Sequence, residues 1–125
     1  MPNREKQTVK RSEEITNAYF SLLDKHLEEI VQGRVTEMMK LNQIAARLFI
    51  SHKHLTDTIQ QTKGHHPCHF YDLKIIEQAQ KMLAETDLSA GEIAGVLTYD
   101  PSNFSKFFRK FTKQTPGAFR QESKK

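Results

Sequence analysis

Apolar residues along this chain recur at the spacing of amphipathic helices, and one such arrangement occurs twice. Gln43-Ile44-Ala45 returns 49 residues later as Glu92-Ile93-Ala94. Each copy consists of a short amphipathic segment, a break and a second amphipathic segment, which is typical of a helix-turn-helix. The same offset relates Leu48 to Leu97, Leu55 to Phe104, Ile59 to Phe108, Pro67 to Pro116 and Phe70 to Phe119.

Two small residues, Ala45 and Ala94, stand where a pair of helices must cross closely, and the apolar pairs would fix the crossing angle. A single match of this kind is weak, because any two packed helices need similar spacing. Two matches in register within about a hundred residues predict a DNA-binding protein with two helix-turn-helix motifs.

One longer amphipathic helix is predicted ahead of the first motif. Residues 1–11 are polar and are expected to be disordered, and residues 12–40 are expected to form a helix and a connector. The helix would begin at an N-cap, Ser12, and end near Gly33, with a further helical turn over residues 37–40. Its apolar face has two interpretations, docking on the following domain or forming a dimer interface. The apolar positions are Ile15, Tyr19, Leu22, Leu23, Ile30 and Val31.

The DNA-binding domain is expected over residues 41–122, and no segment shows the alternation of a strand. The predicted fold is therefore all-α, with two helix-turn-helix subdomains joined by a long spacer helix and an extra N-terminal amphipathic helix. Its parts are a first motif at 41–63 (helices 41–48 and 52–62), a spacer helix at 70–85, a second motif at 89–112 (helices 89–97 and 102–112) and a short helix near 115–122.

Two serines are predicted N-caps of these helices. Ser51 precedes the second helix of the first motif, and Ser89 forms a capping box with Glu92. Gly64 would end the second helix of the first motif. The apolar face of the spacer helix is predicted at Leu73, Ile76, Ala79, Gln80 and Leu83.

Composition narrows the classes of function. The 125 residues suit one domain, the single cysteine excludes an internal disulfide, and no apolar run is long enough to cross a membrane. The net charge of +4 lies in residues 89–125, which carry seven Lys or Arg against three Asp or Glu, whereas the rest of the chain is balanced. A basic C-terminal third that coincides with the second motif favours contact with phosphates over a merely solvated tail.

The chain resembles the DNA-binding domain of the AraC/XylS family of bacterial transcription regulators over residues 41–121. The resemblance implies seven helices and two recognition helices that enter successive major grooves. In longer members it also implies an N-terminal effector or dimerisation domain. The matching residues are Ile44-Ala45, Ser51, Leu55, Gly64, Ala79, Leu83, Asp87-Leu88-Ser89, Glu92-Ile93-Ala94, the run from Asn103 to Lys110, Thr115-Pro116 and Phe119-Arg120.

Several positions depart from the family pattern. Phe49 and Thr98 stand in the two turns where glycine is usual, and Lys113 stands where a glycine commonly ends a helix. Asp57 occupies a position of the first recognition helix that is often arginine, and Ile75 replaces a common arginine of the spacer helix.

In a helix-turn-helix, the N-terminal part of the second helix meets base edges, while flanking groups hold phosphates. We therefore expect Lys53 to donate to guanine, Gln60 to pair with adenine and Asp57 to accept from cytosine, although Asp57 could equally be a plain solvent-facing residue. The candidates for base contact are His52, Lys53, Thr56, Asp57, Gln60, Asn103, Ser105 and Lys106. The candidates for phosphate contact are Ser51, Ser102, Arg109 and Lys110.

The charge distribution suggests different tasks for the two motifs. The basic C-terminal third, which contains the second motif, should supply most of the nonspecific affinity, and the first motif, in the balanced part of the chain, more of the selectivity. Two grooves reached by one protomer require recognition helices about 34 Å apart, so binding does not require a dimer.

A histidine-rich segment offers an alternative function. His65, His66, Cys68 and His69 carry nitrogen and thiolate donors that zinc or copper accepts, but their spacing matches no standard closed metal site. Histidines that only titrate are the simpler interpretation, so we expect no metal and no cofactor. A metal-responsive regulator that uses residues 65–69 remains an alternative.

Among other classes, an enzyme is not expected, because no phosphate-binding loop, nucleophile motif or carboxylate pair occurs. A helical protein-interaction adaptor is the second alternative, but it should present apolar residues on the outer face of the second helices. The expected partners are double-stranded DNA, RNA polymerase if the protein is an activator, and an N-terminal sensory domain if the chain is part of a larger regulator. The expected location is the cytoplasm, in association with the nucleoid.

Overall fold

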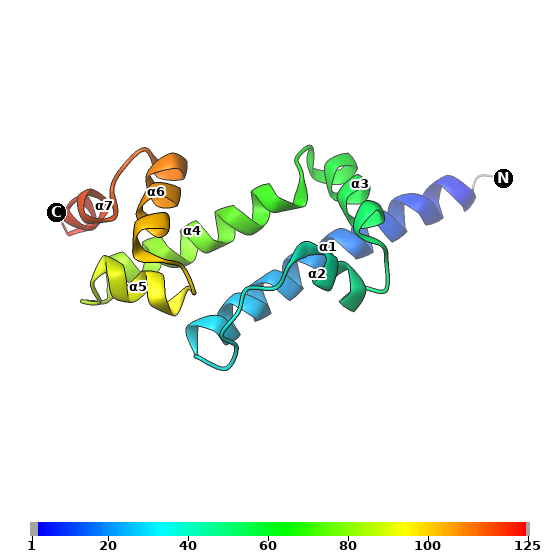
Figure 1. Ribbon diagram of the computed structural model, residues 1–125. Helices are drawn as coiled ribbons and strands as arrows, with labels where there is room; N and C mark the ends of the chain where they lie inside the picture. Colours follow the sequence, from blue (N-terminus) through cyan, green and yellow to red (C-terminus); the bar gives the residue numbers. More distant parts are fainter. Residues whose placement is uncertain (1–2, 125) are drawn as a thin grey trace. The chain divides into compact units, whose positions relative to one another are not determined.

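The computed structural model describes the backbone of residues 3–124 and the side chains of residues 10–124 (Figure 1). Residues 3–124 form seven helices and no strand, as predicted. No helix within these residues is long and apolar enough to cross a membrane. The helices are α1 (Asn3–Val31), α2 (Leu41–Arg47), α3 (His52–Lys63), α4 (Pro67–Glu85), α5 (Ala90–Val96), α6 (Pro101–Thr112) and α7 (Pro116–Ser123).

The chain forms two compact units. The first contains Met1–His26 and Met39–Tyr71, and the second contains Leu27–Met38 and Asp72–Lys125. Each unit therefore holds one helix-turn-helix motif, α2–α3 in the first and α5–α6 in the second. The spacer helix α4 contributes its first residues to the first unit and the remainder to the second, so it links the two motifs along the chain.

The first helix is longer than the sequence predicted. Residues 3–11, which were expected to be disordered, continue α1 toward the N-terminus, while residues 1 and 2 lie outside the described part. Residues 4–11 contain neither glycine nor proline and are rich in Lys, Arg, Glu and Gln, which lose little side-chain freedom in a helix. At the other end Gly33 adopts a left-handed backbone with φ of 77°, as a C′ glycine does.

Within the first unit, α1 contacts α3 and the start of α4, as docking on the following domain requires. The hydroxyl of Tyr19 donates to the carbonyl of Pro67 at 2.8 Å, and the hydroxyls of Thr16 and Thr62 lie 2.8 Å apart. The buried apolar positions of α1 are Ile15, Tyr19, Leu23, Leu27 and Ile30, whereas Leu22 and Val31, also predicted to be apolar contacts, are half-buried.

The connector before the first motif contains no helical turn over residues 37–40, contrary to the prediction. Its backbone is instead held by two aromatic side chains. The Nε2 atom of His26 accepts from the Met39 amide at 2.9 Å, and the Tyr71 hydroxyl donates to the Met39 carbonyl at 2.9 Å. Because both polar groups of Met39 are bonded to side chains, they are not available for helical hydrogen bonds.

The spacer helix begins three residues earlier than predicted, at Pro67, because proline at the first position of a helix has a suitable φ and loses no hydrogen bond. Cys68 and His69 therefore lie in its first turn and not in a loop. Two residues predicted for its buried face, Leu73 and Gln80, are half-buried. The buried face consists of Tyr71, Ile75, Ile76, Ala79, Met82 and Leu83.

The C-terminal helix α7 is tied to the end of α4 by one guanidinium group. Arg120 donates to the carbonyls of Leu83 at 3.0 Å, of Thr86 at 3.2 Å, and of Leu88. These are carbonyls that the last turn of α4 and the following segment leave without a helical donor. Arg120 thus serves as a C-terminal cap supplied by another helix, a role that its place near the end of the chain did not reveal.

Within residues 3–124, three residues other than glycine have a left-handed backbone, and all three stand where the AraC/XylS resemblance implies glycine. Phe49 and Thr98, in the two turns, have φ of 60° and 67°, and Lys113 has φ of 65°. Gly64 occupies the position equivalent to Lys113 and has φ of 79°. The turn geometry is therefore retained although the side chains cost energy there.

Replacement of Lys113 by glycine is expected to raise the free energy of unfolding by about 1 kcal/mol, because the left-handed backbone strains any residue with a Cβ. The reciprocal control is Gly64→Lys. No atom lies within 4 Å of a Cβ built at Gly64, so only the backbone strain should count, and this variant should be destabilised by a similar amount. Urea denaturation of both variants tests this, and equal stability of all three proteins would contradict it.

Candidate nucleic-acid interface

The second helices of the two motifs, α3 and α6, have the same inward face. Leu55 and Ile59 on α3, and Phe104 and Phe108 on α6, are fully buried. Packing of these residues fixes the rotation of each helix about its own axis. The positions on the opposite side of each helix are therefore turned outward.

The outer face of α3 presents the predicted reading residues of the first motif. His52, Lys53, Asp57 and Gln60 are exposed, and Thr56 is half-buried. The helix starts where the sequence predicted, because the Ser51 hydroxyl oxygen accepts from the His54 amide at 3.0 Å. Since a hydroxyl group can accept and donate at once, the exposed Ser51 can still donate its proton to a phosphate.

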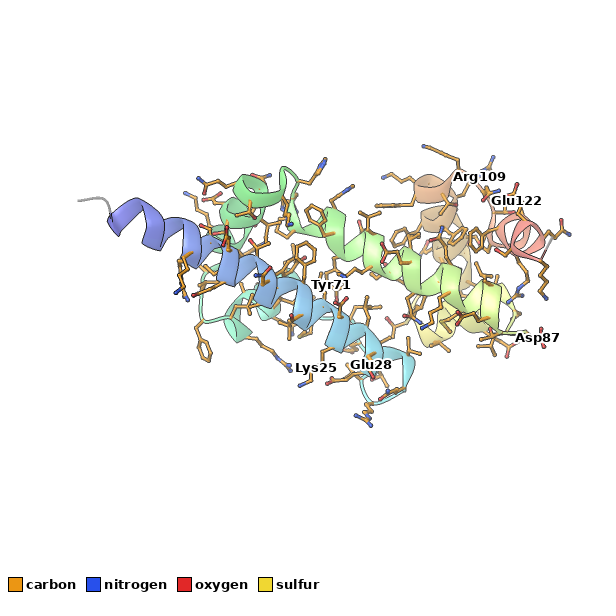
Figure 2. All side chains as sticks on the ribbon, turned by 180° about the vertical axis from the view of Figure 1, so that it is seen from behind. Lys25, Glu28, Tyr71, Asp87, Arg109 and Glu122 are labelled. Atoms are coloured by element: carbon orange, nitrogen blue, oxygen red, sulfur yellow. The ribbon has the colours of Figure 1, made fainter. Side chains whose placement is uncertain are left out.

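The outer face of α6 is more basic than that of α3. All of its predicted contact residues are exposed, and Arg109 projects from the helix in Figure 2. These residues are Ser102, Asn103, Ser105, Lys106, Arg109 and Lys110. Apart from Pro101, no apolar residue of α6 is exposed beside them, whereas the adaptor alternative requires an exposed apolar face. Side chains of this kind suit contact with phosphates and base edges.

The start of α6 differs from the prediction by one residue. The helix begins at Pro101 and not at Ser102, because the Asp100 carboxylate accepts from the amides of Ser102 and Asn103 at 3.1 and 3.2 Å. A carboxylate cap followed by proline is a strong start signal. The capping box of the preceding helix is confirmed, since Ser89 and Glu92 bond to each other's amides at 3.0 and 3.1 Å.

A cluster of aromatic rings joins the turn before α6 to α6 itself. One of its members, Tyr99, was not predicted from the sequence to pack there. The ring centroids of Tyr99 and Phe107 lie 5.3 Å apart, and those of Phe107 and Phe111 lie 5.4 Å apart. Phe107 and Phe111 are both half-buried, so neither belongs fully to the core. Burial, and to a lesser extent the negative charge of Asp72, raises the pKa of Tyr99 to about 12.

The histidine-rich segment is not assembled into a metal site. Among the described residues, no three His, Cys, Asp or Glu side chains are placed to hold one ion together. The rings of His65 and His69 stack with centroids 4.4 Å apart, and the Nδ1 atom of His66 accepts from the Cys68 amide at 3.0 Å. Because His66 bonds to the backbone at the start of α4, the segment has a structural role as a helix cap.

A model of the helix-turn-helix domain family matches residues 44–122, which include the second half of α2, all of α3 to α6 and most of α7. The chain belongs to the AraC-type helix-turn-helix family of DNA-binding transcription regulators. This family and this fold are those of transcription regulators and not of enzymes. The AraC/XylS resemblance, the all-α fold with two motifs and the DNA-binding function are thereby confirmed, whereas the individual contact residues remain predictions.

Similar proteins carry the same domain. The chain is 27% identical over 109 residues to the HTH-type transcriptional regulator YtdP of Bacillus subtilis, and the match covers 86% of this chain but 14% of that protein. The C-terminal domain of AraT, a response regulator from Geobacillus stearothermophilus, has a TM-score of 0.65 at 26% identity, with 80% of this chain and 84% of that chain covered. The DNA-binding domain of AdpA, solved in complex with a target DNA, has a TM-score of 0.64 at 25% identity, with coverage of 78% and 91%.

Proposed function

We propose that this chain binds a specific double-stranded DNA site by inserting α3 and α6 into successive major grooves. One observation carries this proposal. The two second helices, fixed by buried residues in the same register, each expose polar or charged side chains near their N-terminal ends. The AdpA domain, whose structure contains target DNA, is similar to this chain and supports the proposal.

The two helices have different tasks in this proposal. Lys53 of α3 and Asn103 of α6 meet base edges, because both are exposed within the first turn of their helices. Arg109 and Lys110 hold phosphates farther along α6. Since α6 presents three cations, whereas α3 presents Lys53, Lys63 and Asp57, α6 supplies the larger electrostatic share of the affinity.

Alanine substitution of Lys53 or Asn103 is expected to relax the sequence preference at one position of the site, at a cost of about 1–3 kcal/mol each. Selection of binding sites from a random double-stranded library measures this. The two variants should lose information at different positions, because the residues lie on different recognition helices. A matched control is Lys81→Ala on the exposed side of α4, which should leave the selected sequence unchanged. If either reading variant selected the wild-type sequence in full, that residue would not contact a base.

The wider role of the protein follows from the domain it carries. We propose that the chain acts as the DNA-binding part of a transcription activator that contacts RNA polymerase in the cytoplasm, in association with the nucleoid. Because it spans only 14% of YtdP, a similar domain there is part of a much longer regulator. A sensory domain N-terminal to these residues would fit that arrangement. Transcription of a template bearing the selected site, with and without this chain, tests the activating role.

A further inference from the structure

The outer faces of α3 and α6 carry opposite charges at one equivalent position. The offset of 49 residues that relates the two motifs brings Asp57 of α3 onto Lys106 of α6. Both side chains are exposed. The structure allows a direct check of whether these positions are geometrically equivalent.

The two helices match residue for residue in their local geometry. His52–Lys63 and Pro101–Thr112 each contain 12 residues, and the residue before each helix caps it with a side-chain oxygen. Each helix also ends in a left-handed residue, with φ of 79° at Gly64 and 65° at Lys113. The preceding turns agree as well, and the same pair of positions is fully buried in both helices. Asp57 and Lys106 therefore occupy the same place on their helices.

Groups with opposite hydrogen-bonding character must seek different base edges. An ionised carboxylate only accepts hydrogen bonds, and a lysine ammonium group only donates them. In the major groove, cytosine offers an amino donor, whereas guanine offers the O6 and N7 acceptors. A carboxylate near phosphates is repelled by them, so a recognition helix that carries one favours DNA in which a base offers it a donor.

We propose that the two motifs read opposite partners at equivalent positions, Asp57 accepting from the amino group of a cytosine and Lys106 donating to a guanine. This inference rests on the proposed insertion of both helices into DNA. It follows that the two half-sites differ in sequence and that the chain binds its site in one orientation. Asp57 also weakens binding to DNA that lacks a cytosine at that position, because its carboxylate is then left near phosphates without a hydrogen-bond donor.

The decisive variant is Asp57→Asn, which keeps the size of the side chain and adds an amide donor. An asparagine pairs with adenine through one donor and one acceptor. At the one position where the wild type selects cytosine, the variant should therefore prefer adenine over cytosine by about tenfold. Binding to random DNA should rise at the same time, because a negative charge has been removed. The reciprocal variant Lys106→Gln should change a guanine to adenine in the other half-site only.

Selection from a random double-stranded library is carried out with wild type, both variants and a control, Glu77→Gln. The control removes a negative charge from an exposed position of α4 and should leave the selected sequence unchanged. Thermal melting of each protein confirms that it is folded, which is expected because all the changed side chains are exposed or half-buried.

The outcomes separate this inference from the proposed function. A cytosine-to-adenine change confined to one position in the Asp57→Asn selection supports the inference. A wild-type sequence selected by Asp57→Asn, or a change at a position that is not cytosine, overturns it and leaves specific DNA binding intact. Failure of the wild-type chain to enrich any sequence overturns the proposed function and the inference together.

Discussion

Removal of two positive charges from α6, in the double variant Arg109→Ala, Lys110→Ala, is expected to weaken binding to every DNA sequence. Both side chains are exposed on α6, which carries three cations and no acidic residue. If each neutralises one phosphate, the slope of log K against log salt concentration should become shallower by about 2. The selected sequence should stay the same, because contacts with phosphates carry no direct sequence information.

Fluorescence anisotropy titrations over a series of salt concentrations measure this slope. The matched control is the double variant Lys25→Ala, Arg34→Ala, which removes one lysine and one arginine from exposed positions outside both motifs. It changes the net charge equally, so it isolates the effect of position. If the control lowered the slope as much as the α6 variant did, the charge of the whole chain and not the α6 surface would govern affinity.

The second large effect is expected on stability. Arg120→Ala should lower the free energy of unfolding by about 3 kcal/mol, because three charge-assisted hydrogen bonds to backbone carbonyls are lost. These carbonyls lie in a partly buried region and would need water as a substitute. Arg120→Lys should recover only part of the loss, since an ammonium group cannot span three acceptors as a guanidinium does.

Urea denaturation measures the loss, with Arg11→Ala as the control. Arg11 is paired with Glu14 at 4.0 Å on the exposed side of α1, and pairs of this kind contribute little. The control should therefore fall within about 0.5 kcal/mol of wild type. A similarly small effect for Arg120→Ala would mean that α7 is held by its other contacts, of which the ring contact between Phe108 and Phe119 is one.

The parts of the fold that could be predicted from the sequence are those that depend on interactions between residues close together in the chain. The N-caps Ser51 and Ser89 and the left-handed C-cap Gly64 fix helix ends by hydrogen bonds within a few residues, and they occur where predicted. The inward faces of α3 and α6 were also predictable, because their helical spacing is regular. These signals are enough to place the outward residues of both motifs.

The predictions that failed depend on contacts between distant segments or on weak local signals. The extended connector depends on His26 and Tyr71, which reach Met39 across 13 and 32 positions of the chain. The role of Arg120 likewise depends on carbonyls more than 30 residues away. No local pattern marks such contacts. The start of α1 was missed for another reason, since a polar segment rich in helix-forming residues resembles a disordered one in composition.

In the candidate site, too, the features set by local helical periodicity could be predicted, and those set by distant groups could not. Which side chains face outward follows from helical periodicity, so the predicted reading residues are exposed or, in the case of Thr56, half-buried. Which of them meet a base or a phosphate depends on the DNA, and neither the sequence nor the free protein contains that information. The contribution of Tyr99 below α6 was missed because a single aromatic residue in a turn carries no periodic signal.

The central claim is that one chain reads two successive major grooves with α3 and α6. Methylation interference at guanine N7 on a selected site tests it most directly, because N7 lies in the major groove. Two interfering clusters about 10–10.5 base pairs apart are expected on one face of the DNA. The Lys53→Ala variant should lose only one of these clusters, and Lys106→Ala only the other. A single cluster, or two clusters that both persist in each variant, would contradict the claim.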